Sequence, residues 1–221
     1  MINIAIDGPA GAGKSTIARK VAQELSYIYV DTGAMYRAMA LYLYRNGISA
    51  DDADKIAASC SGAEISIEYR DGEQVVILGG ENVNPYLRTQ EVSAMASKSS
   101  AVPQVRTRLM QLQKELAATQ NVVMDGRDIG TVVLPDAQVK IFLTASVEVR
   151  ANRRYLELKK KGEPAVLEQI AAEIADRDHR DMTREVAPLK QADDAVFVDT
   201  SDMTIDEVTQ HILSIVKEKI G

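Results

Sequence analysis

Two hydrophobic patterns alternate along this chain. One is a short continuous run of apolar residues, and the other is a series of apolar residues at helical spacing. Short apolar runs predict buried strands over residues 2–6, 27–30, 121–124, 139–143 and 195–198. Apolar positions at helical spacing predict helices over residues 14–25, 31–46, 52–59, 89–100, 103–118, 146–161, 167–180 and 204–219. Strands that alternate with helices indicate an α/β fold with a parallel sheet covered on both faces.

One segment departs from this alternation. Ile65, Ile67 and Tyr69 alternate with polar residues, and an Asp71-Gly72 turn leads back along residues 74–78. This pattern is typical of a β-hairpin. We therefore predict a small antiparallel insertion in an otherwise βα chain.

The first predicted strand leads directly into a G-x-x-x-x-G-K-S sequence that runs from Gly8 to Ser15. Glycines let consecutive backbone N–H groups face one phosphate, and the following helix adds its positive N-terminus. Lys14 supplies a cation, and the Ser15 hydroxyl suits the magnesium ion that accompanies a nucleoside triphosphate. The alternative is a glycine-rich turn without a ligand. The sequence favours a triphosphate site.

Composition narrows the class of protein. The 221 residues suffice for one α/β domain, and no apolar stretch approaches the ~20 residues of a membrane span. The N-terminal residues already form a predicted strand rather than a signal peptide, and a single cysteine, Cys60, excludes an internal disulfide. We expect a cytoplasmic protein without a membrane partner. The net charge of −6 argues against a nucleic-acid partner.

Arginines are concentrated despite this acidic balance. Six of them fall in one stretch, at Arg150, Arg153, Arg154, Arg177, Arg180 and Arg184. Two arginine-bearing helices separated by Gly162-Glu-Pro164 could form a lid over polyphosphate. We expect Arg177, Asp181 and Arg184 to share a helix face. The alternative is a solvated face with salt bridges between successive turns.

Polar residues also follow the predicted strand 121–124. Asp125 is a candidate carboxylate near the magnesium ion, although Asp-Gly is a frequent turn in any protein. Arg127 and Asp128 come next, at the carboxyl end of a strand, where open α/β sheets bind ligands. His179 and His211 lie in no catalytic pattern. An acceptor phosphate needs no such base because it is largely ionised at neutral pH.

Five sequence motifs together resemble bacterial cytidylate kinases. They are GPAGAGKST at 8–16, DTGAMYR at 31–37, RTQEVSAMAS at 88–97, DGRDIGTVV at 125–133 and RDHRDMTREVAPL at 177–189. The resemblance implies the P-loop nucleoside monophosphate kinase fold, a five-stranded parallel sheet flanked by helices, with a small antiparallel insertion and a helical lid. It implies a core of residues 1–30, 109–149 and 185–221, a CMP-binding region at 31–108 with its insertion at about 62–88, and a lid at 150–184.

The same resemblance implies a transferase of pyrimidine nucleotide metabolism that converts ATP and CMP into ADP and CDP, accepts dCMP and uses UMP poorly. The implied ATP-binding residues are Gly8, Pro9, Ala10, Gly11, Ala12, Gly13, Lys14, Ser15, Thr16, Arg150, Arg153 and Arg154. The catalytic residues would be Lys14, Arg127, Arg154 and Arg184. Magnesium would be bound with ATP by Ser15, and by Asp125 through water.

The implied CMP-binding residues are Thr32, Tyr36, Arg37, Ser97, Arg106, Arg127, Asp128, Arg177, Asp181 and Arg184. A carboxylate such as Asp128 can accept a hydrogen bond from the amino group of cytosine, whereas uracil presents a carbonyl oxygen there. Such pairing can discriminate strongly between the two bases. Thr32 stands where the family motif can also have serine, and both supply a hydroxyl.

The residues alone are also compatible with two other functions. A P-loop kinase that phosphorylates an alcohol would need an aspartate base, for which Asp31 or Asp128 could serve. A nucleotide-dependent switch would need guanine recognition or a partner surface, and the chain has no Asn-Lys-x-Asp motif. We expect a monomer that acts on small molecules.

Overall fold

The computed structural model describes all 221 residues, and the chain divides into two compact units. The first unit comprises residues 28–122 together with Met1, and the second comprises residues 2–27 and 123–221. No helix has both the length and the apolar character that a membrane span requires. The domain boundaries given above stay a prediction.

The main sheet has five strands in the order β2-β6-β1-β7-β8. Its strands are β1 (Asn3–Asp7), β2 (Ile28–Asp31), β6 (Val122–Gly126), β7 (Val139–Thr144) and β8 (Val196–Asp199). β1 pairs parallel with β7, and β7 pairs parallel with β8. Ile4, Ile6 and Leu143 are fully buried, as the continuous apolar runs of a covered parallel sheet require. The predicted α/β fold with a five-stranded parallel sheet is confirmed.

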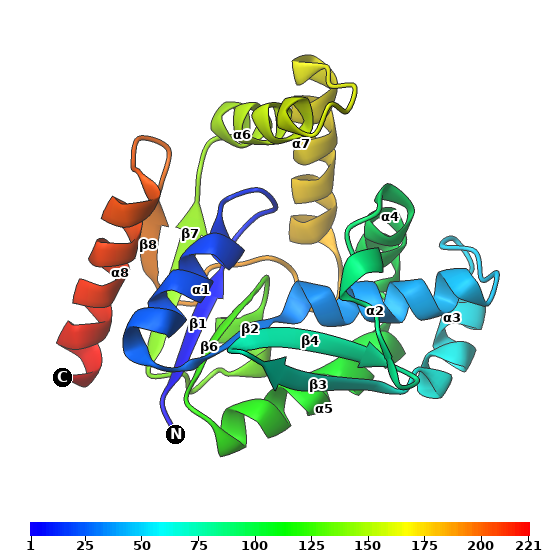
Figure 1. Cartoon of the computed structure of the whole chain (residues 1–221), viewed down its shortest axis with the longest axis horizontal. Helices are drawn as coiled ribbons and strands as arrows, with labels where there is room; N and C mark the ends of the chain where they lie inside the picture. The colour runs from blue at the N-terminus through cyan, green and yellow to red at the C-terminus, as the bar shows by residue number, and fades with distance from the viewer. The chain divides into compact units, whose positions relative to one another are not determined.

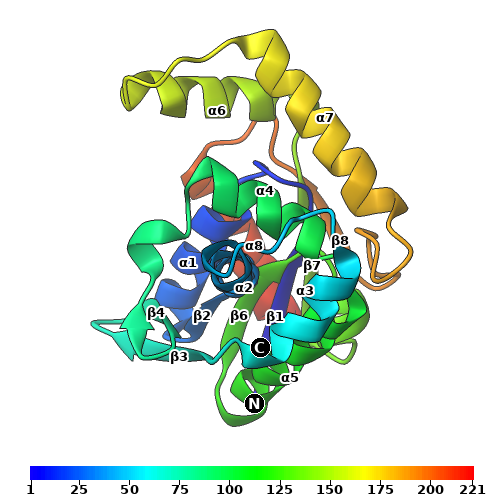
Figure 2. The same cartoon turned by 90° about the vertical axis from the view of Figure 1, so that its right-hand side faces the viewer.

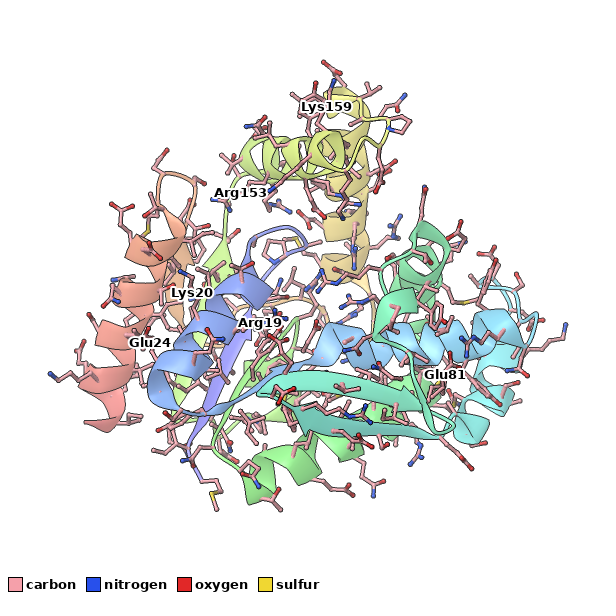
Figure 3. All side chains as sticks on the ribbon, in the orientation of Figure 1. Arg19, Lys20, Glu24, Glu81, Arg153 and Lys159 are labelled. Carbon is pink, nitrogen blue, oxygen red and sulfur yellow. The ribbon has the colours of Figure 1, made fainter.

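Four helices belong to the second unit: α1 (Lys14–Leu25), α6 (Val147–Lys160), α7 (Leu167–Thr183) and α8 (Ile205–Ile220). α1 packs beside α8, and Lys20 of α1 forms an ion pair of 2.7 Å with Asp206 of α8 (Figure 3). α6 and α7 lie beyond the carboxyl ends of β1 and β7 (Figure 1). They pack against each other, and the segment with the Gly162-Glu-Pro164 break connects the end of α6 to the start of α7 (Figure 2).

The first unit holds α2 (Thr32–Arg45), α3 (Ala53–Ser59), α4 (Gln90–Ser99) and α5 (Pro103–Thr119). Its separate antiparallel sheet consists of β3 (Ile65–Arg70), β4 (Glu73–Leu78) and a short β5 (Glu81–Asn82). This sheet confirms the predicted insertion. α2 packs against α4, α5 and β4, so apolar residues such as Met35 and Met39 are fully buried.

Three short helices have no counterpart among the predicted elements. Two are 3₁₀-helices, at Cys60–Gly62 and Asn84–Tyr86. The third, η3, is a π-helix at Ile129–Val133, in which the N–H of Leu134 donates to the carbonyl of Ile129 at 2.7 Å. Hydrogen bonds of this i to i+5 type carry no sequence period that would reveal them, and they are often found at functional sites.

The insertion is tied to the end of β2 by one buried side chain. Gln74 of β4 accepts a hydrogen bond from the N–H of Asp31 at 2.8 Å and donates to the carbonyl of the same residue at 3.2 Å. Its amide thus pairs with both main-chain groups of Asp31, as a neighbouring strand would. Since Asp31 caps α2 through its side chain, this pairing fixes where the helix begins.

Replacing Gln74 with methionine should lower the free energy of unfolding by about 2–4 kcal/mol, because two buried main-chain groups lose their partners. Urea denaturation of the wild type and the variant measures this loss. Gln111→Met is the control, since the Gln111 side chain is exposed and bonds only Glu115 within α5. Equal stabilities of the two variants would contradict the assigned role of Gln74.

Candidate active site

The loop Gly8–Gly13 joins β1 to α1 with backbone angles that favour glycine. Gly8, Gly11 and Gly13 have φ values of 148°, 75° and 90°. A Cβ atom at Gly8 would clash with the carbonyl oxygen of Leu143 in β7. Gly13 occupies the N-cap of α1 and offers no side-chain cap, so the first N–H groups of the helix are free of side-chain competition. A phosphate group suits this helix N-terminus.

Lys14 lies at the base of this loop and is only 5% exposed. Its ammonium group donates to the carbonyl of Pro9 at 2.7 Å. Burial, followed by repulsion from Arg127, lowers the pKa of Lys14 well below its ordinary value, while Asp125 and Asp7 act against this shift. Two cations that lie close enough to repel each other form a site of positive potential for an anion.

The residues predicted to serve magnesium are adjacent. The Ser15 hydroxyl donates to Asp125 Oδ2 at 3.0 Å, and Asp125 is buried at the end of β6. A hydroxyl and a carboxylate are the hard oxygen donors that Mg²⁺ prefers when nucleotide phosphates complete its coordination. The donor set therefore fits a magnesium ion carried with a triphosphate.

Two arginines of the predicted acceptor site are held by carboxylates. Arg127 forms an ion pair of 2.9 Å with Asp181 of α7, and Arg184 lies 3.4 Å from Asp128. Burial acts to raise the pKa of Asp181, but Arg127, Arg177 and Arg184 together hold it below its ordinary value. Asp181 therefore stays ionised among positive charges.

The expectation that Arg177, Asp181 and Arg184 share one helix face is wrong for Arg184. α7 ends at Thr183, and Arg184 is its C-cap with an extended backbone (φ −60°, ψ 140°). Its Nε donates to the carbonyl of Ala187 at 2.7 Å. The chain therefore turns at Arg184 and directs its guanidinium group to Asp128 instead of continuing the helix.

The three arginines of α6 that were predicted to bind ATP all have protein partners. Arg150 is buried, donates to the carbonyls of Ala145 and Ala10, and pairs with Asp178 of α7 at 2.6 Å. Arg153, labelled in Figure 3, donates to the Thr200 carbonyl at 2.8 Å. Arg154 pairs with Glu157 at 2.8 Å on an exposed surface. Contacts of these three arginines with ATP stay predictions.

The first unit contains the other predicted acceptor residues. Arg37 Nη2 lies 3.2 Å from the carboxylate of Asp31, which also accepts from the N–H of Ala34 at 2.8 Å. Thr32 is buried in the first turn of α2. This segment places a hydroxyl and a guanidinium group within two turns of one helix.

A second group in the same unit joins α2 to the neighbouring helices. The guanidinium group of Arg106 lies 5.6 Å from the ring of Tyr36 and donates to the carbonyl of Ser100 at 3.2 Å. The Ser97 hydroxyl is buried and has no hydrogen-bond partner. A buried polar atom without a partner is costly, so Ser97 is a candidate ligand contact.

Sequence reasoning missed Asp7, the last residue of β1. Its two carboxylate oxygens accept from the N–H groups of Ile129 at 2.8 Å and Gly130 at 2.7 Å. Burial outweighs these hydrogen bonds and raises the pKa of Asp7 to about 6. The signal was a charged residue directly after an apolar run, which is unusual for the buried end of a strand.

Comparison with known proteins decides the family. The family model for cytidylate kinase matches residues 4–218. The chain belongs to the cytidylate kinase family. A cytidylate kinase of Caldicellulosiruptor bescii is 52% identical over 214 residues, covering 97% of this chain and 95% of that relative. One of Lactobacillus johnsonii is 47% identical over 219 residues, covering 99% and 95%.

Solved structures agree on the fold of this cytidylate kinase family member. A gluconokinase from Sinorhizobium meliloti aligns with a TM-score of 0.51 at 14% identity, covering 99% of this chain and 93% of that one. An uncharacterized protein from Eubacterium ventriosum aligns with a TM-score of 0.55 at 12% identity, covering 98% and 99%. At these identities the likeness concerns the fold alone.

The raised pKa of Asp7 gives a prediction for stability. A carboxyl group whose pKa rises from 3.8 to about 6 on folding favours the folded state below pH 3.8, and this contribution is lost as the pH rises through 6. The free energy of unfolding of the wild type, relative to Asp7→Asn, should therefore fall by about 2 kcal/mol from pH 4.5 to 7.5.

Urea denaturation of both proteins at the two pH values measures this difference. Asp194→Asn is the control, because Lys140 holds the pKa of Asp194 below its ordinary value. Its difference from the wild type should stay constant over the same range. A constant difference for Asp7→Asn as well would contradict the raised pKa.

Proposed function

We propose that this cytidylate kinase family member transfers the γ-phosphoryl group of ATP to CMP and, as a second acceptor, dCMP, which gives ADP and CDP or dCDP. The observation that carries this proposal is the buried Lys14 at the start of α1, next to the Ser15–Asp125 contact, with Arg127 directly after the end of β6. Lys14 belongs to the phosphate loop, and Arg127 pairs with Asp181 on α7. A transferring phosphoryl group with its bridging oxygens suits such a pair of cations.

On the donor side, we assign ATP to residues Gly8–Thr16. The N–H groups at the start of α1 would bind phosphate oxygens, and Lys14 would exchange its bond to Pro9 for the phosphates. Ser15 and Asp125 would hold magnesium, which, when bound, neutralises charge on the phosphates. Arg150, Arg153 and Arg154 are assigned to ATP on the family resemblance, with Arg154 also as a catalytic residue.

On the acceptor side, we assign the CMP phosphate to Arg37, Arg127 and Arg184, with Thr32 and Tyr36 as supports. Bidentate guanidinium groups suit this task because they align one phosphate against another and compensate the repulsion. No protein base is required, because the acceptor phosphate has a second pKa of about 6 and is largely ionised. Arg127 and Arg184 also stabilise charge in the transition state.

The base and sugar of CMP are assigned to the remaining predicted residues. Ser97, Arg106 and Asp128 would bind cytosine, and Asp181, oriented by Arg177, would bind the sugar hydroxyl. The buried Ser97 hydroxyl supports this proposal, because it has a hydrogen bond to give. We also propose that residues 31–108 form the CMP-binding region and 150–184 the lid of a cytoplasmic monomer.

Turnover with a panel of acceptors tests the function. ADP release coupled to NADH oxidation should be fastest with CMP and dCMP, slower with UMP, and at background with AMP and shikimate. Shikimate tests the alternative of an alcohol kinase, and ATP turnover that ignores every acceptor would point to a switch. Absence of CMP-dependent ADP release would refute the proposed function.

Removal of the proposed cytosine ligand tests the base assignment. Asp128→Ala should reduce the ratio of kcat/KM for CMP over UMP by about 10- to 100-fold, because the amino group of cytosine loses its acceptor. Steady-state kinetics with both substrates measures the ratio. Lys14→Ala is the comparison, since losing transition-state charge compensation should lower kcat by about 100-fold or more for both acceptors. Equal losses for the two bases in Asp128→Ala would contradict its role.

A further inference from the structure

We propose that Asp7 is a positioning residue for the acceptor, because it anchors the backbone of the loop Gly126–Gly130 that carries Arg127 and Asp128. The inference deepens the proposed function and rests on it. Asp7 is not among the residues assigned above to ATP or CMP. It acts through the loop and contacts neither substrate.

Two successive N–H groups define the anchor. Asp7 Oδ1 accepts from Ile129 at 2.8 Å and Oδ2 accepts from Gly130 at 2.7 Å, so both oxygens are engaged by one short segment. The donors lie 122 and 123 positions away along the chain. They are the first N–H groups of η3, whose own N-cap residue, Asp128, forms no side-chain cap. Asp7 therefore supplies the cap that the local sequence lacks.

The anchor restrains a loop with an uncommon backbone. Asp128 has φ −143° and ψ 25°, and the two following N–H groups are the ones that Asp7 binds. A Cβ atom at Gly130 would lie 3.4 Å from Asp7 Oδ2 and 3.2 Å from Lys140 Cδ. The backbone of Gly130 therefore packs closely against the side chains of Asp7 and Lys140.

The support from Asp7 differs from that of α7. Asp181 and Arg184 hold the side chains of Arg127 and Asp128, and both lie at the end of α7, on the proposed lid. Asp7 holds the backbone of the same loop and belongs to β1 of the sheet core. It keeps the loop in register with the phosphate loop, which begins at the next residue, Gly8. Phosphoryl transfer depends on such alignment, and a misplacement of about 1 Å can cost 100-fold in rate.

Replacement of Asp7 by asparagine tests the hydrogen bonds to the loop while it keeps the size of the side chain. Asparagine has nearly the same volume, but only one of its terminal atoms accepts a hydrogen bond, so one N–H loses its partner. We expect kcat/KM for CMP to fall about 10- to 100-fold. The ratio of kcat/KM for CMP over kcat/KM for UMP should fall as well, because Asp128 moves with the loop. The Kd of ATP, measured by calorimetry without CMP, should change much less than kcat/KM for CMP, because Asp7 makes no hydrogen bond to the phosphate loop and acts on Lys14 only through its charge.

Glu207→Gln is the matched control. Glu207 also accepts from a backbone N–H, that of Thr204 at 2.8 Å, but at the exposed start of α8. Its kinetics should equal those of the wild type. Thermal unfolding establishes that each variant is folded at the assay temperature.

Two results would overturn the inference. One is a loss of ATP affinity as large as the loss in kcat/KM for CMP, which would make Asp7 a general support of the phosphate loop. The other is wild-type kinetics in Asp7→Asn. If that variant does not fold, Asp7→Ser decides, because its side chain keeps only one of the two acceptor oxygens. It should lower kcat/KM for CMP much more than ATP affinity, and wild-type values would refute the anchor.

CMP turnover by the wild-type protein distinguishes a failure of this inference from a failure of the proposed function. Wild type that phosphorylates CMP, with Asp7→Asn unaffected, contradicts the anchor alone. Wild type without CMP turnover contradicts the proposed function, and the anchor for CMP falls with it.

Discussion

Burying charge costs several kcal/mol per ion unless a partner compensates it, and this constraint shapes the second unit. Arg150 and Asp178 are both buried and lie 2.6 Å apart. The partly buried Arg127 is likewise paired, at 2.9 Å, with the buried Asp181. Because these guanidinium groups are paired with carboxylates, their charge does not destabilise the fold. They also provide positive charge that suits the binding of phosphates.

These pairs connect elements far apart in the sequence. Arg150 of α6 donates to the carbonyl of Ala10 in the phosphate loop and pairs with Asp178 on α7, so one side chain links the loop to both helices. Asp7 links β1 to the loop after β6. A change in position of α7 would therefore reach the phosphate loop through Arg150, while the loop Gly126–Gly130 keeps a second anchor in the sheet. Charged side chains therefore connect the phosphate loop with α7, and β1 with the loop after β6.

The sequence predicted what has a local signal. Strands, helices and the insertion follow from hydrophobic period, and the Ser15–Asp125 contact follows from a phosphate loop and a strand-end carboxylate. The π-helix at Ile129–Val133 could not be predicted, because its first two N–H groups are capped by Asp7, 122 and 123 positions away. The end of α7 was also missed: arginine is a good helix former, and the turn at Arg184 depends on its bonds to Ala187 and Asp128. Roles of individual residues toward ATP and CMP have no local signal, and they remain proposals.

The hydrogen bonding of the carboxylates also bears on the choice between a phosphate and an alcohol as acceptor. An alcohol kinase needs an ionised aspartate that can approach the acceptor hydroxyl and take its proton. The carboxylate of Asp31 caps α2 and pairs with Arg37, and the carboxylate of Asp128 pairs with Arg184. Asp181 has a lowered pKa and is a poor base. Asp7 has the raised pKa that a base would need, but both of its oxygens accept backbone N–H groups. An acceptor that brings its own ionised oxygen fits this set of carboxylates best, and a nucleoside monophosphate is such an acceptor.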